Sequence, residues 1–408
     1  MSDGLQTPGL LSGVRVLDFT QFIAGPVATR LMGELGAEVI KVELAPGGDN
    51  ARALPNFRDG RSAYFVQHNV GKKSLCIDLG KPEARELLLG LVEKVDVLVE
   101  NFSPGVIGRL GFGWDVVHKR NPTLIMCSIS AMGQKGPLAR LKGFDFVAQA
   151  YSGISDVIGN PGEPPAAVGA AIGDTGTGMM AMAAINAALY ARAKPMGTGQ
   201  YLDIAMIDFY MQCHELNVQI ASTSGGANVP TRNGSLHNTI CPIGMFSCRD
   251  GYILVVCIGD HWKRLAKVLG RPELIDDPRY RDNAARMQHR DEVVAIVEDW
   301  LMRHTVEQAL DALEKEGLPC APVLSVDQAM RHPHLLERGT IRTISDPVFG
   351  QFQVPGMPLR FSGFPLRDPG QAPFLGQHNE EVLRDYAGLD AASVERLTQA
   401  GVLKEKRV

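Results

Sequence analysis

Short apolar runs alternate with helix-like segments in the first third of the chain, and this alternation limits the possible folds more than any other feature. Residues 14–19 form a short apolar run, residues 26–35 show helical periodicity opened by a proline, and residues 38–43 again have strand character. These segments predict one βαβ unit. The alternation continues at residues 74–79, 83–94, 96–99 and 123–128. The simplest interpretation is an α/β fold, with a parallel sheet covered by helices.

The character of the chain changes twice after this region. Long helical patterns cover residues 174–193 and 203–222, and the Gly-, Ser- and Asn-rich loop at 225–238 is the best internal boundary. Residues 245–258 predict two strands around a turn at 249–251, followed by two or three helices up to residue 316. After residue 322 the chain is rich in proline, which predicts an extended segment that packs on the first domain or on a partner subunit.

Charge and terminal sequence exclude several classes of partner. The net charge of −4, the pI near 6.2 and the lack of a lysine or arginine run argue against nucleic-acid or membrane binding. Residues 1–13 contain neither a basic leader nor a long apolar stretch, and the apolar run at 179–193 is too short to span a bilayer. We therefore expect a cytoplasmic protein with no membrane partner.

Common catalytic motifs are missing from the sequence. It has no GxSxG, P-loop or HExxH motif, and its seven cysteines lack ligand-like spacing. His332 and His334 flank a proline in a polar loop, which favours a surface loop over a metal site. We therefore expect no metal.

The first strand-to-helix turn, residues 20–26, contains one glycine instead of the dinucleotide-binding GxGxxG pattern. Gly25 permits a close backbone approach, and Pro26 opens a helix whose free N–H groups can face an anion. A plain structural turn fits these residues equally well. The turn therefore leaves both possibilities open.

Asp174 is the most informative single residue. It lies in the glycine-rich segment 171–178 directly before a long apolar helix, where an N-cap aspartate is the simplest interpretation. The alternative is a nucleophile. The helix dipole stabilises a carboxylate there by about 0.3–1 kcal/mol, a usual pKa of about 3.9 leaves it charged at neutral pH, and it can attack an acyl carbon without a general base. Gly176 and Gly178 would leave room for an acyl group and offer N–H donors to an oxyanion.

Four segments together resemble the class III CoA transferases, a family that includes formyl-CoA transferase, carnitine CoA transferase and α-methylacyl-CoA racemase. The resemblance runs nearly end to end. It is carried by LSGVRVLDFTQFIAGPVATRLMGELGAEVIKVE (11–43), DVLVENFSPGVIGRLGFGW (96–114), GDTGTGM (173–179) and GLPCAPVLSVDQAMRHPHL (317–335). It implies that Asp174 is the catalytic nucleophile rather than a helix cap.

The resemblance also implies the domain organisation. A large Rossmann-like domain has a parallel sheet built from both chain ends, and a smaller α+β domain comes from the middle of the chain. We expect residues 1–224 to form the large CoA-binding domain, residues 225–330 the small domain, and residues 331–408 a segment that returns to the large domain and wraps a partner. The implied assembly is an interlocked homodimer.

The family's coenzyme A pocket can be carried over residue by residue. It implies contacts from Ile23, Ala24, Leu44, Ile77, Asp78, Leu79, Gly80, Lys81, Asn101, Phe102, Ser103, Arg109, Lys142, Gly143, Phe144 and Asp145. Arg109 and Lys142 suit phosphates, and Phe102 offers an apolar surface for adenine. Leu44 replaces a basic residue of some relatives, for which Lys81 can compensate.

Two further residues are predicted to contact the acceptor. These are Gly176, beside the nucleophile, and His237, which lies in residues 232–238, where formyl-CoA transferase has a glycine-rich flap. The flap itself is not recognisable in this sequence. A plain loop histidine is the alternative for His237.

Residue 144 separates the two reactions of the family. Racemisation needs an acid and a base on opposite faces of a carbon, and the racemase branch has a histidine where this chain has Phe144. We therefore expect transfer of CoA to a small, dicarboxylic acid through an aspartyl mixed anhydride and an aspartyl-CoA thioester. CoA is a co-substrate, and no other cofactor is expected. A 2-methylacyl-CoA racemase and a non-catalytic CoA-binding protein remain the alternatives.

Overall fold

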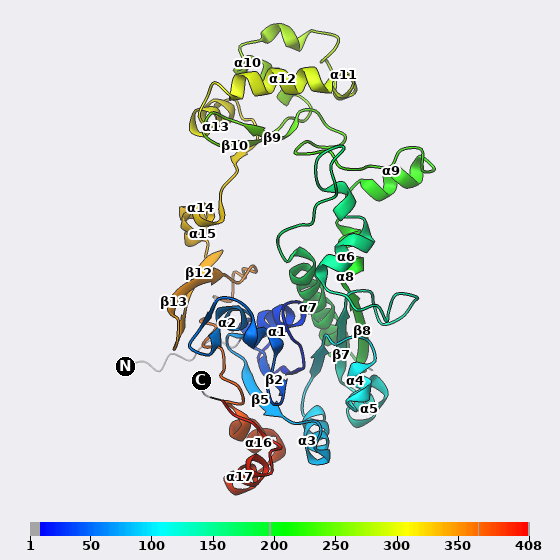
Figure 1. Cartoon of the computed structure of the whole chain (residues 1–408), viewed down its shortest axis with the longest axis vertical. Coiled ribbons are helices and arrows are strands. Elements are labelled where there is room, and N and C mark those ends of the chain that lie inside the picture. The colour runs from blue at the N-terminus through cyan, green and yellow to red at the C-terminus, as the bar shows by residue number, and fades with distance from the viewer. Residues whose placement is uncertain (1–8, 196, 366, 407–408) are drawn as a thin grey trace. The chain divides into compact units, whose positions relative to one another are not determined.

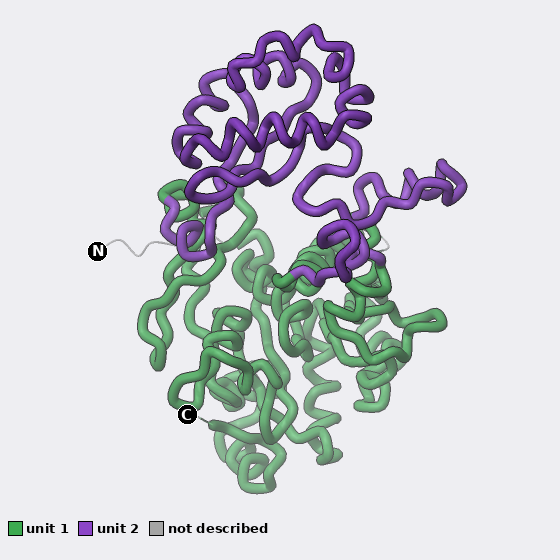
Figure 2. The backbone as a smooth tube through the Cα atoms, turned by 45° about the horizontal axis from the view of Figure 1, so that its top comes forward, with its two compact units in different colours: residues 1–152, 169–213, 333–408 green, residues 153–168, 214–332 purple. Residues whose placement is uncertain are grey.

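The computed structural model describes residues 9–195, 197–365 and 367–406. The chain divides into two compact units, which Figure 2 shows in different colours. Unit 1 contains the described parts of residues 1–152, 169–213 and 333–408, and unit 2 contains residues 153–168 and 214–332.

A six-stranded sheet forms the centre of unit 1 (Figure 1), and all of its neighbouring strands are parallel. In spatial order the strands are β5 (Lys73–Ile77), β2 (Glu38–Leu44), β1 (Arg15–Asp18), β6 (Val97–Glu100), β7 (Ile125–Ser130) and β8 (Gln200–Ala205). Counted along the chain this is the order 3-2-1-4-5-6, the doubly wound order of dinucleotide-binding folds. The predicted parallel α/β architecture is confirmed.

The expectation that both chain ends build this sheet is wrong. All six strands come from residues 15–205, and the C-terminal end adds helices α16 (Asn379–Ala387) and α17 (Ala391–Gln399) instead. It reaches the sheet at the edge strand β5, where Leu403 forms an isolated bridge with Ile77 and the Lys404 N–H donates to the Cys76 carbonyl at 3.1 Å. These contacts cover part of an edge that would otherwise present unpaired backbone groups.

The long helix predicted over residues 203–222 is also wrong. The structure has β8 there, followed by two short helices, α8 (Met206–Gln212) and α9 (Asn217–Thr223). β8 is an edge strand that pairs only with β7, so much of it is exposed and it lacks the continuous apolar run of a central strand. Asp203, a poor strand former, is stabilised by accepting the Gln134 N–H.

Helices cover both faces of the sheet. α1 (Ala24–Glu34) packs against α7 (Ile172–Arg192), and residues 24–32 of α1 are all buried. A second layer contains α3 (Pro82–Val92), α5 (Trp114–Arg120), α16 and α17, whose apolar side chains share one core with strands β1, β2, β5 and β6. The apolar strands are therefore covered on both sides, as a parallel sheet requires.

The remaining elements of unit 1 lie outside the sheet. They are the 3₁₀ turn η1 (Asn50–Ala53), the small hairpins β3 (Phe57–Arg58) with β4 (Arg61–Ser62) and β12 (Ile341–Asp346) with β13 (Gly350–Pro355), and helices α2 (Ala63–Asn69), α4 (Val106–Arg109), α6 (Asp145–Ser152), α8 and α15 (Pro333–Glu337).

Unit 2 is an α+β unit with its own core. Its antiparallel sheet has the order β11 (Cys320–Pro322), β10 (Tyr252–Val256), β9 (Ile243–Ser247), and β9 and β10 confirm the strand pair predicted around residues 249–251. Its helices are η2 (Ser155–Val157), α9, α10 (His261–Val268), η3 (Pro272–Ile275), α11 (Asn283–Gln288), α12 (Arg290–Leu301), α13 (Val306–Lys315) and α14 (Val326–Arg331). Among the described residues, no helix is long and apolar enough to cross a membrane.

The unit boundaries differ from those expected at residues 225 and 331. The glycine-rich loop lies inside unit 2, because Arg232 pairs with Asp156 and the Gly234 N–H donates to the Gly159 carbonyl at 2.9 Å. These contacts bring residues 153–168 into unit 2. The division therefore falls between residues 213 and 214, and between residues 332 and 333.

Candidate active site

A cavity of about 680 Å³ opens at the carboxyl edge of the parallel sheet in unit 1. Its walls come from residues 21–23 after β1, 101–104 after β6, 129–132 at the end of β7, 141–146, and the start of α7. β1 and β6 are the neighbouring strands at which the strand order reverses, and ligands of doubly wound folds bind at this switch point. The cavity therefore lies where the topology favours a ligand.

Asp174 lines this cavity from the first turn of α7. The helix begins at Ile172, its N-cap residue is Ala171, and no side chain of the N-cap position bonds the helix. The N-cap interpretation of Asp174 is therefore wrong. Its carboxylate is not committed to its own helix end and faces the cavity.

Asp145 and Tyr210 bond the N–H groups at the start of α7 instead. The Gly173 N–H donates to the Tyr210 hydroxyl oxygen at 3.0 Å, and the Asp174 N–H donates to Asp145 Oδ2 at 3.2 Å. The Tyr210 hydroxyl in turn donates to Asp145 Oδ1. Asp145 is buried, so it fixes the helix end that carries Asp174.

The surroundings of Asp174 change its acidity. Burial, and next to it the negative charge of Asp145, raise the pKa of the Asp174 carboxyl from 3.8 to about 7. The sequence suggested full ionisation at neutral pH, because it shows the helix dipole but neither the burial nor the second carboxylate. Perturbed carboxyl groups in a cleft are typical of functional sites.

Tyr64 is a cavity residue that the sequence analysis missed. It lies in α2, and burial followed by the negative charges of Asp174 and Asp49 raises the pKa of its hydroxyl to about 12. The hydroxyl therefore stays protonated and can donate a hydrogen bond beside Asp174. Nothing in the local sequence marks this tyrosine, because its position depends on the packing of α2 beside a distant part of the chain.

Half of the predicted coenzyme A residues line the cavity. These are Ile23, Asn101, Phe102, Ser103, Lys142, Gly143, Phe144 and Asp145. Of the described residues that line it, Lys142 is the only one with a basic side chain. The rings of Phe22 and Phe144 meet edge to face with centroids 6.0 Å apart, and Phe144 is 67% exposed. Much of the wall is therefore apolar.

The other predicted coenzyme A residues lie outside the cavity wall. They are Ala24, Leu44, Ile77, Asp78, Leu79, Gly80, Lys81 and Arg109. Ala24 and Ile77 are buried, so their side chains cannot reach a ligand. Residues 78–81 follow the carboxyl end of β5, and Arg109 is exposed at the end of α4. These segments follow the same edge of the sheet, and their contacts with CoA stay predictions.

His237 lies in unit 2, whereas Asp174 lies in unit 1. The ring Nδ1 of His237 accepts the Thr239 N–H at 3.2 Å, and the backbone N–H of His237 donates to the Ile243 carbonyl at 2.9 Å. These bonds hold the loop of residues 232–238. A role in acceptor binding stays a prediction.

Gly176 has a packing role that the sequence did not show. A Cβ atom at residue 176 would lie 2.0 Å from the Phe209 ring, and one at residue 178 would lie 2.4 Å from the Ala24 carbonyl oxygen. The absence of a side chain at residue 176 therefore makes room for the Phe209 ring, and its absence at residue 178 allows the start of α1 to approach α7. The expectation that these glycines leave room for an acyl group does not match this packing.

Gly176→Ala should lower the stability of the protein. The added methyl group must displace the Phe209 ring, and overpacking of this kind costs about 1–3 kcal/mol. Gly90→Ala is the matched control, since residue 90 lies in α3 with no atom within 4 Å of a new Cβ, and there the better helix propensity of alanine should raise stability. Thermal unfolding measures both variants. Equal melting temperatures would contradict the packing role.

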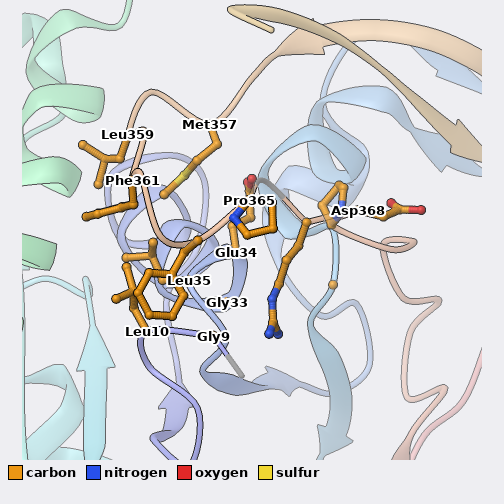
Figure 3. Close-up of a pocket in the computed structure, with 14 residues that line it drawn as sticks. Gly9, Leu10, Gly33, Glu34, Leu35, Met357, Leu359, Phe361, Pro365 and Asp368 are labelled. Carbon is orange, nitrogen blue, oxygen red and sulfur yellow. The ribbon is translucent and has the colours of Figure 1, made fainter. Parts of the chain in front are cut away.

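A second cavity, of about 460 Å³, lies elsewhere in unit 1 (Figure 3). It is lined by the end of α1 and by residues of segments 357–365 and 367–369, with Leu10, Leu359 and Phe361 on one side. Glu34, one of the two acids in its lining, pairs with Arg30 and Arg342. Because α1 begins at the carboxyl edge of the sheet, its end lies toward the opposite edge, away from Asp174.

No group of three or more His, Cys, Asp or Glu side chains in the described residues is arranged to hold a metal ion. The expectation that the chain uses no metal and no cofactor other than CoA stays a prediction.

The model of CoA-transferase family III matches residues 11–379. The chain is 34% identical to succinyl-CoA:glutarate CoA-transferase of Mus musculus, over 97% of this chain and 90% of the relative. It is 35% identical to formyl-CoA:oxalate CoA-transferase of Streptomyces avermitilis, over 96% of this chain and 99% of the relative. The chain belongs to CoA-transferase family III. The resemblance stated from the motifs is confirmed, and the protein is a CoA transferase.

Solved structures support the same fold for this family III transferase. A CAIB/BAIF family protein from Brucella suis matches with a TM-score of 0.81 and 33% identity, over 93% of this chain and 100% of that chain. The protein Rv3272 from M. tuberculosis matches with a TM-score of 0.80 and 30% identity, over 91% of this chain and 98% of that chain.

Proposed function

We propose that this family III transferase moves CoA from an acyl-CoA to a small dicarboxylic acid through covalent intermediates on Asp174. The observation that carries the proposal is the position of Asp174, in the first turn of α7 and in the wall of the switch-point cavity. The carboxylate that faces this cavity can attack a thioester carbonyl without a general base. Tyr64 beside it supplies a hydroxyl donor for the oxyanion that forms.

The first half of the reaction loads CoA onto the enzyme. The Asp174 carboxylate attacks the carbonyl carbon of the donor thioester, the C–S bond breaks, and CoA thiolate leaves behind an aspartyl mixed anhydride. The thiolate then attacks the aspartyl carbonyl carbon, and the donor acid leaves as its carboxylate. Asp174 now carries CoA as a thioester, and no proton has been gained or lost.

The second half repeats these steps with the acceptor. The acceptor carboxylate attacks the aspartyl thioester, CoA thiolate leaves again, and a new mixed anhydride forms. The thiolate attacks the acceptor's acyl carbon and releases the Asp174 carboxylate. Water must be kept out throughout, because it would hydrolyse either intermediate. The apolar rings of Phe22 and Phe144 in the cavity wall suit this requirement.

The choice of a dicarboxylic acceptor rests on the relatives. Their names give glutarate, oxalate and, for a Haloarcula hispanica enzyme 36% identical to this chain, mesaconate. For CoA itself we propose that Lys142 and the exposed Arg109 and Lys81 pair with phosphates, and that Phe102 contacts the adenine ring. Phe144 carries no proton, so nothing favours a racemase.

We also propose that the enzyme is an interlocked homodimer. Helix α7 is apolar nearly all round, yet it leaves Ile172, Met179 and Tyr190 exposed at 44%, 38% and 69%. An apolar helix normally has both faces covered. A second copy of the chain is the occupant expected for the exposed face.

Trapping the aspartyl thioester tests the mechanism. The enzyme is incubated with succinyl-CoA, quenched with hydroxylamine, digested and analysed by mass spectrometry. We expect hydroxamate on Asp174 and on no other carboxylate, and none in the Asp174→Asn variant. Modification of a different residue, or transfer by the variant at the wild-type rate, would overturn the proposal.

A further inference from the structure

We propose that Lys41 and Asp49 are positioning residues for CoA transfer, because they hold Phe22 in a left-handed backbone conformation at the edge of the active-site cavity. The inference rests on the proposed function of that cavity. Neither residue lines the cavity. Their effect on the rate of transfer would therefore act through the turn of residues 20–23.

Phe22 has an unusual backbone. Its φ angle is 63°, in the left-handed region, where the β-carbon of an L-residue crowds the following carbonyl. Bulky residues persist there only when surrounding contacts over-determine the conformation, and such residues cluster at active sites and ligand clamps. Phe22 lies between β1 and α1, and it lines the cavity.

Three consecutive residues of this turn are each held by a side chain from elsewhere in unit 1. Lys41 Nζ donates to the Thr20 carbonyl at 2.7 Å. Asn101 bonds both the N–H and the carbonyl of Gln21, each at 2.8 Å. The Phe22 N–H donates to Asp49 Oδ1 at 3.2 Å. The turn is therefore anchored at every residue that precedes Ile23.

Lys41 and Asp49 form a deeply buried ion pair. Lys41 Nζ lies 2.8 Å from Asp49 Oδ2, and the side chains are 0% and 1% exposed. Burying two charges costs so much desolvation that such a pair seldom adds stability, but removing one partner leaves the other charge uncompensated. The main effect of the pair is therefore on local conformation rather than on stability. It holds the backbone of Thr20 and Phe22, to which Lys41 and Asp49 are hydrogen-bonded.

The turn touches both walls of the cavity. The Phe22 ring meets Phe144 edge to face, and a Cβ on Gly178 of α7 would lie 2.4 Å from the Ala24 carbonyl oxygen. The helix that carries Asp174 therefore packs directly against the residues that follow Phe22. If Phe22 relaxed to a negative φ, its ring would leave Phe144, and the start of α1 would move against α7.

The chain offers a closely matched control pair. Asp346 Oδ2 pairs with Arg61 Nε at 2.7 Å, and the side chains of Asp346 and Arg61 are 0% and 4% exposed. Asp346 Oδ1 accepts the N–H groups of Val348 and Phe349. Asp346 therefore combines a buried ion pair with backbone N–H bonds, as Asp49 does. Neither Asp346 nor its partner lines the cavity that holds Asp174.

Full-length Asp49→Ala, Asp49→Asn and Asp346→Asn proteins are compared with wild type in the steady-state transfer of CoA from succinyl-CoA to glutarate. Small misplacements of a catalytic site cost about a hundredfold, so we expect kcat of Asp49→Ala to fall by about tenfold to a hundredfold. Asp49→Asn retains an oxygen acceptor for the Phe22 N–H, so it should lose less. Asp346→Asn should lose thermal stability but keep kcat within about twofold.

Two results would overturn the inference. One is wild-type kcat in both Asp49 variants, and the other is an equal loss of kcat in Asp346→Asn. If Asp49→Ala does not fold, the comparison of Asp49→Asn with Asp346→Asn decides. Hydroxamate trapping separates this inference from the proposed function, because a wild-type enzyme that never labels Asp174 would refute the mechanism, whereas labelling in all variants with equal kcat refutes only the positioning role.

Discussion

Asp174→Asn is expected to abolish CoA transfer and, at alkaline pH, to make the protein more stable. Asparagine has nearly the same shape but is not a nucleophile toward a thioester. Removal of a nucleophile lowers kcat on the order of 10⁴-fold or more. The Asp145 carboxylate can still accept the N–H of residue 174, so the start of α7 should keep its structure.

The gain in stability follows from the sign of the pKa change. The folded protein raises the pKa of Asp174 to about 7, above the usual value of 3.8. The folded state therefore prefers the protonated form. Below pH 4 the carboxyl group is protonated in both the folded and the unfolded state, so it does not change the free energy of unfolding. Its destabilising effect grows as the pH rises from 4 to 7 and stays constant above pH 7. Each unit of pKa corresponds to about 1.4 kcal/mol, so the variant should gain up to a few kcal/mol at pH 8.

Thermal unfolding at pH 4 and pH 8, together with steady-state kinetics, measures both effects. The melting temperature of Asp174→Asn should exceed that of wild type at pH 8 and match it at pH 4. Asp96→Asn is the control, because Asp96 lies before β6, at the other edge of the sheet. Its carboxylate accepts the Arg15 N–H and pairs with Arg192, so this variant should not gain stability at pH 8. An Asp174→Asn variant as active as wild type would contradict the role of Asp174 as the nucleophile. A variant less stable than wild type at pH 8 would contradict the conclusion that the ionised carboxylate destabilises the fold.

The pattern of short apolar runs predicted most of the parallel sheet, and the resemblance to the class III CoA transferases predicted Asp174 as the nucleophile. Five of the six parallel strands are marked by short apolar runs, because most of their residues are buried. These five include the edge strand β5, in which four of the five residues are buried. The other edge strand, β8, was missed because only its last residue is buried and it contains the polar Asp203. Local sequence cannot show which runs become edges.

The surroundings of Asp174 could not be predicted from local sequence. Asp145 was assigned to CoA from the resemblance, but its carboxylate accepts the N–H of Asp174 and the hydroxyl of Tyr210, which lie in different elements. The glycines at 176 and 178 suggested open space, but Phe209 and Ala24 occupy that space. Each of these contacts joins segments far apart in the chain, and only the folded structure brings them together.

The second large effect concerns pH. In the proposed mechanism, attack on the thioester requires the ionised Asp174 carboxylate, and a pKa of about 7 places its titration near neutral pH. We expect kcat/KM to rise about tenfold per pH unit up to about pH 7 and then to level off. Between pH 9 and pH 5 the loss should therefore be on the order of a hundredfold.

The Asp145→Asn variant tests whether Asp174 causes the fall in kcat/KM below pH 7, which is the acidic limb of the pH profile. The substitution removes the negative charge that helps to raise the pKa of Asp174, so the limb should move to lower pH, although burial alone keeps that pKa above 3.8. The asparagine oxygen can still accept one of the N–H and hydroxyl donors, and this limits the loss of structure at the start of α7. Because a change in positioning alone would lower the plateau without moving the limb, the two effects can be separated in one profile. An unshifted limb in Asp145→Asn, with the limb of Asp96→Asn moving instead, would show that another group controls the rate.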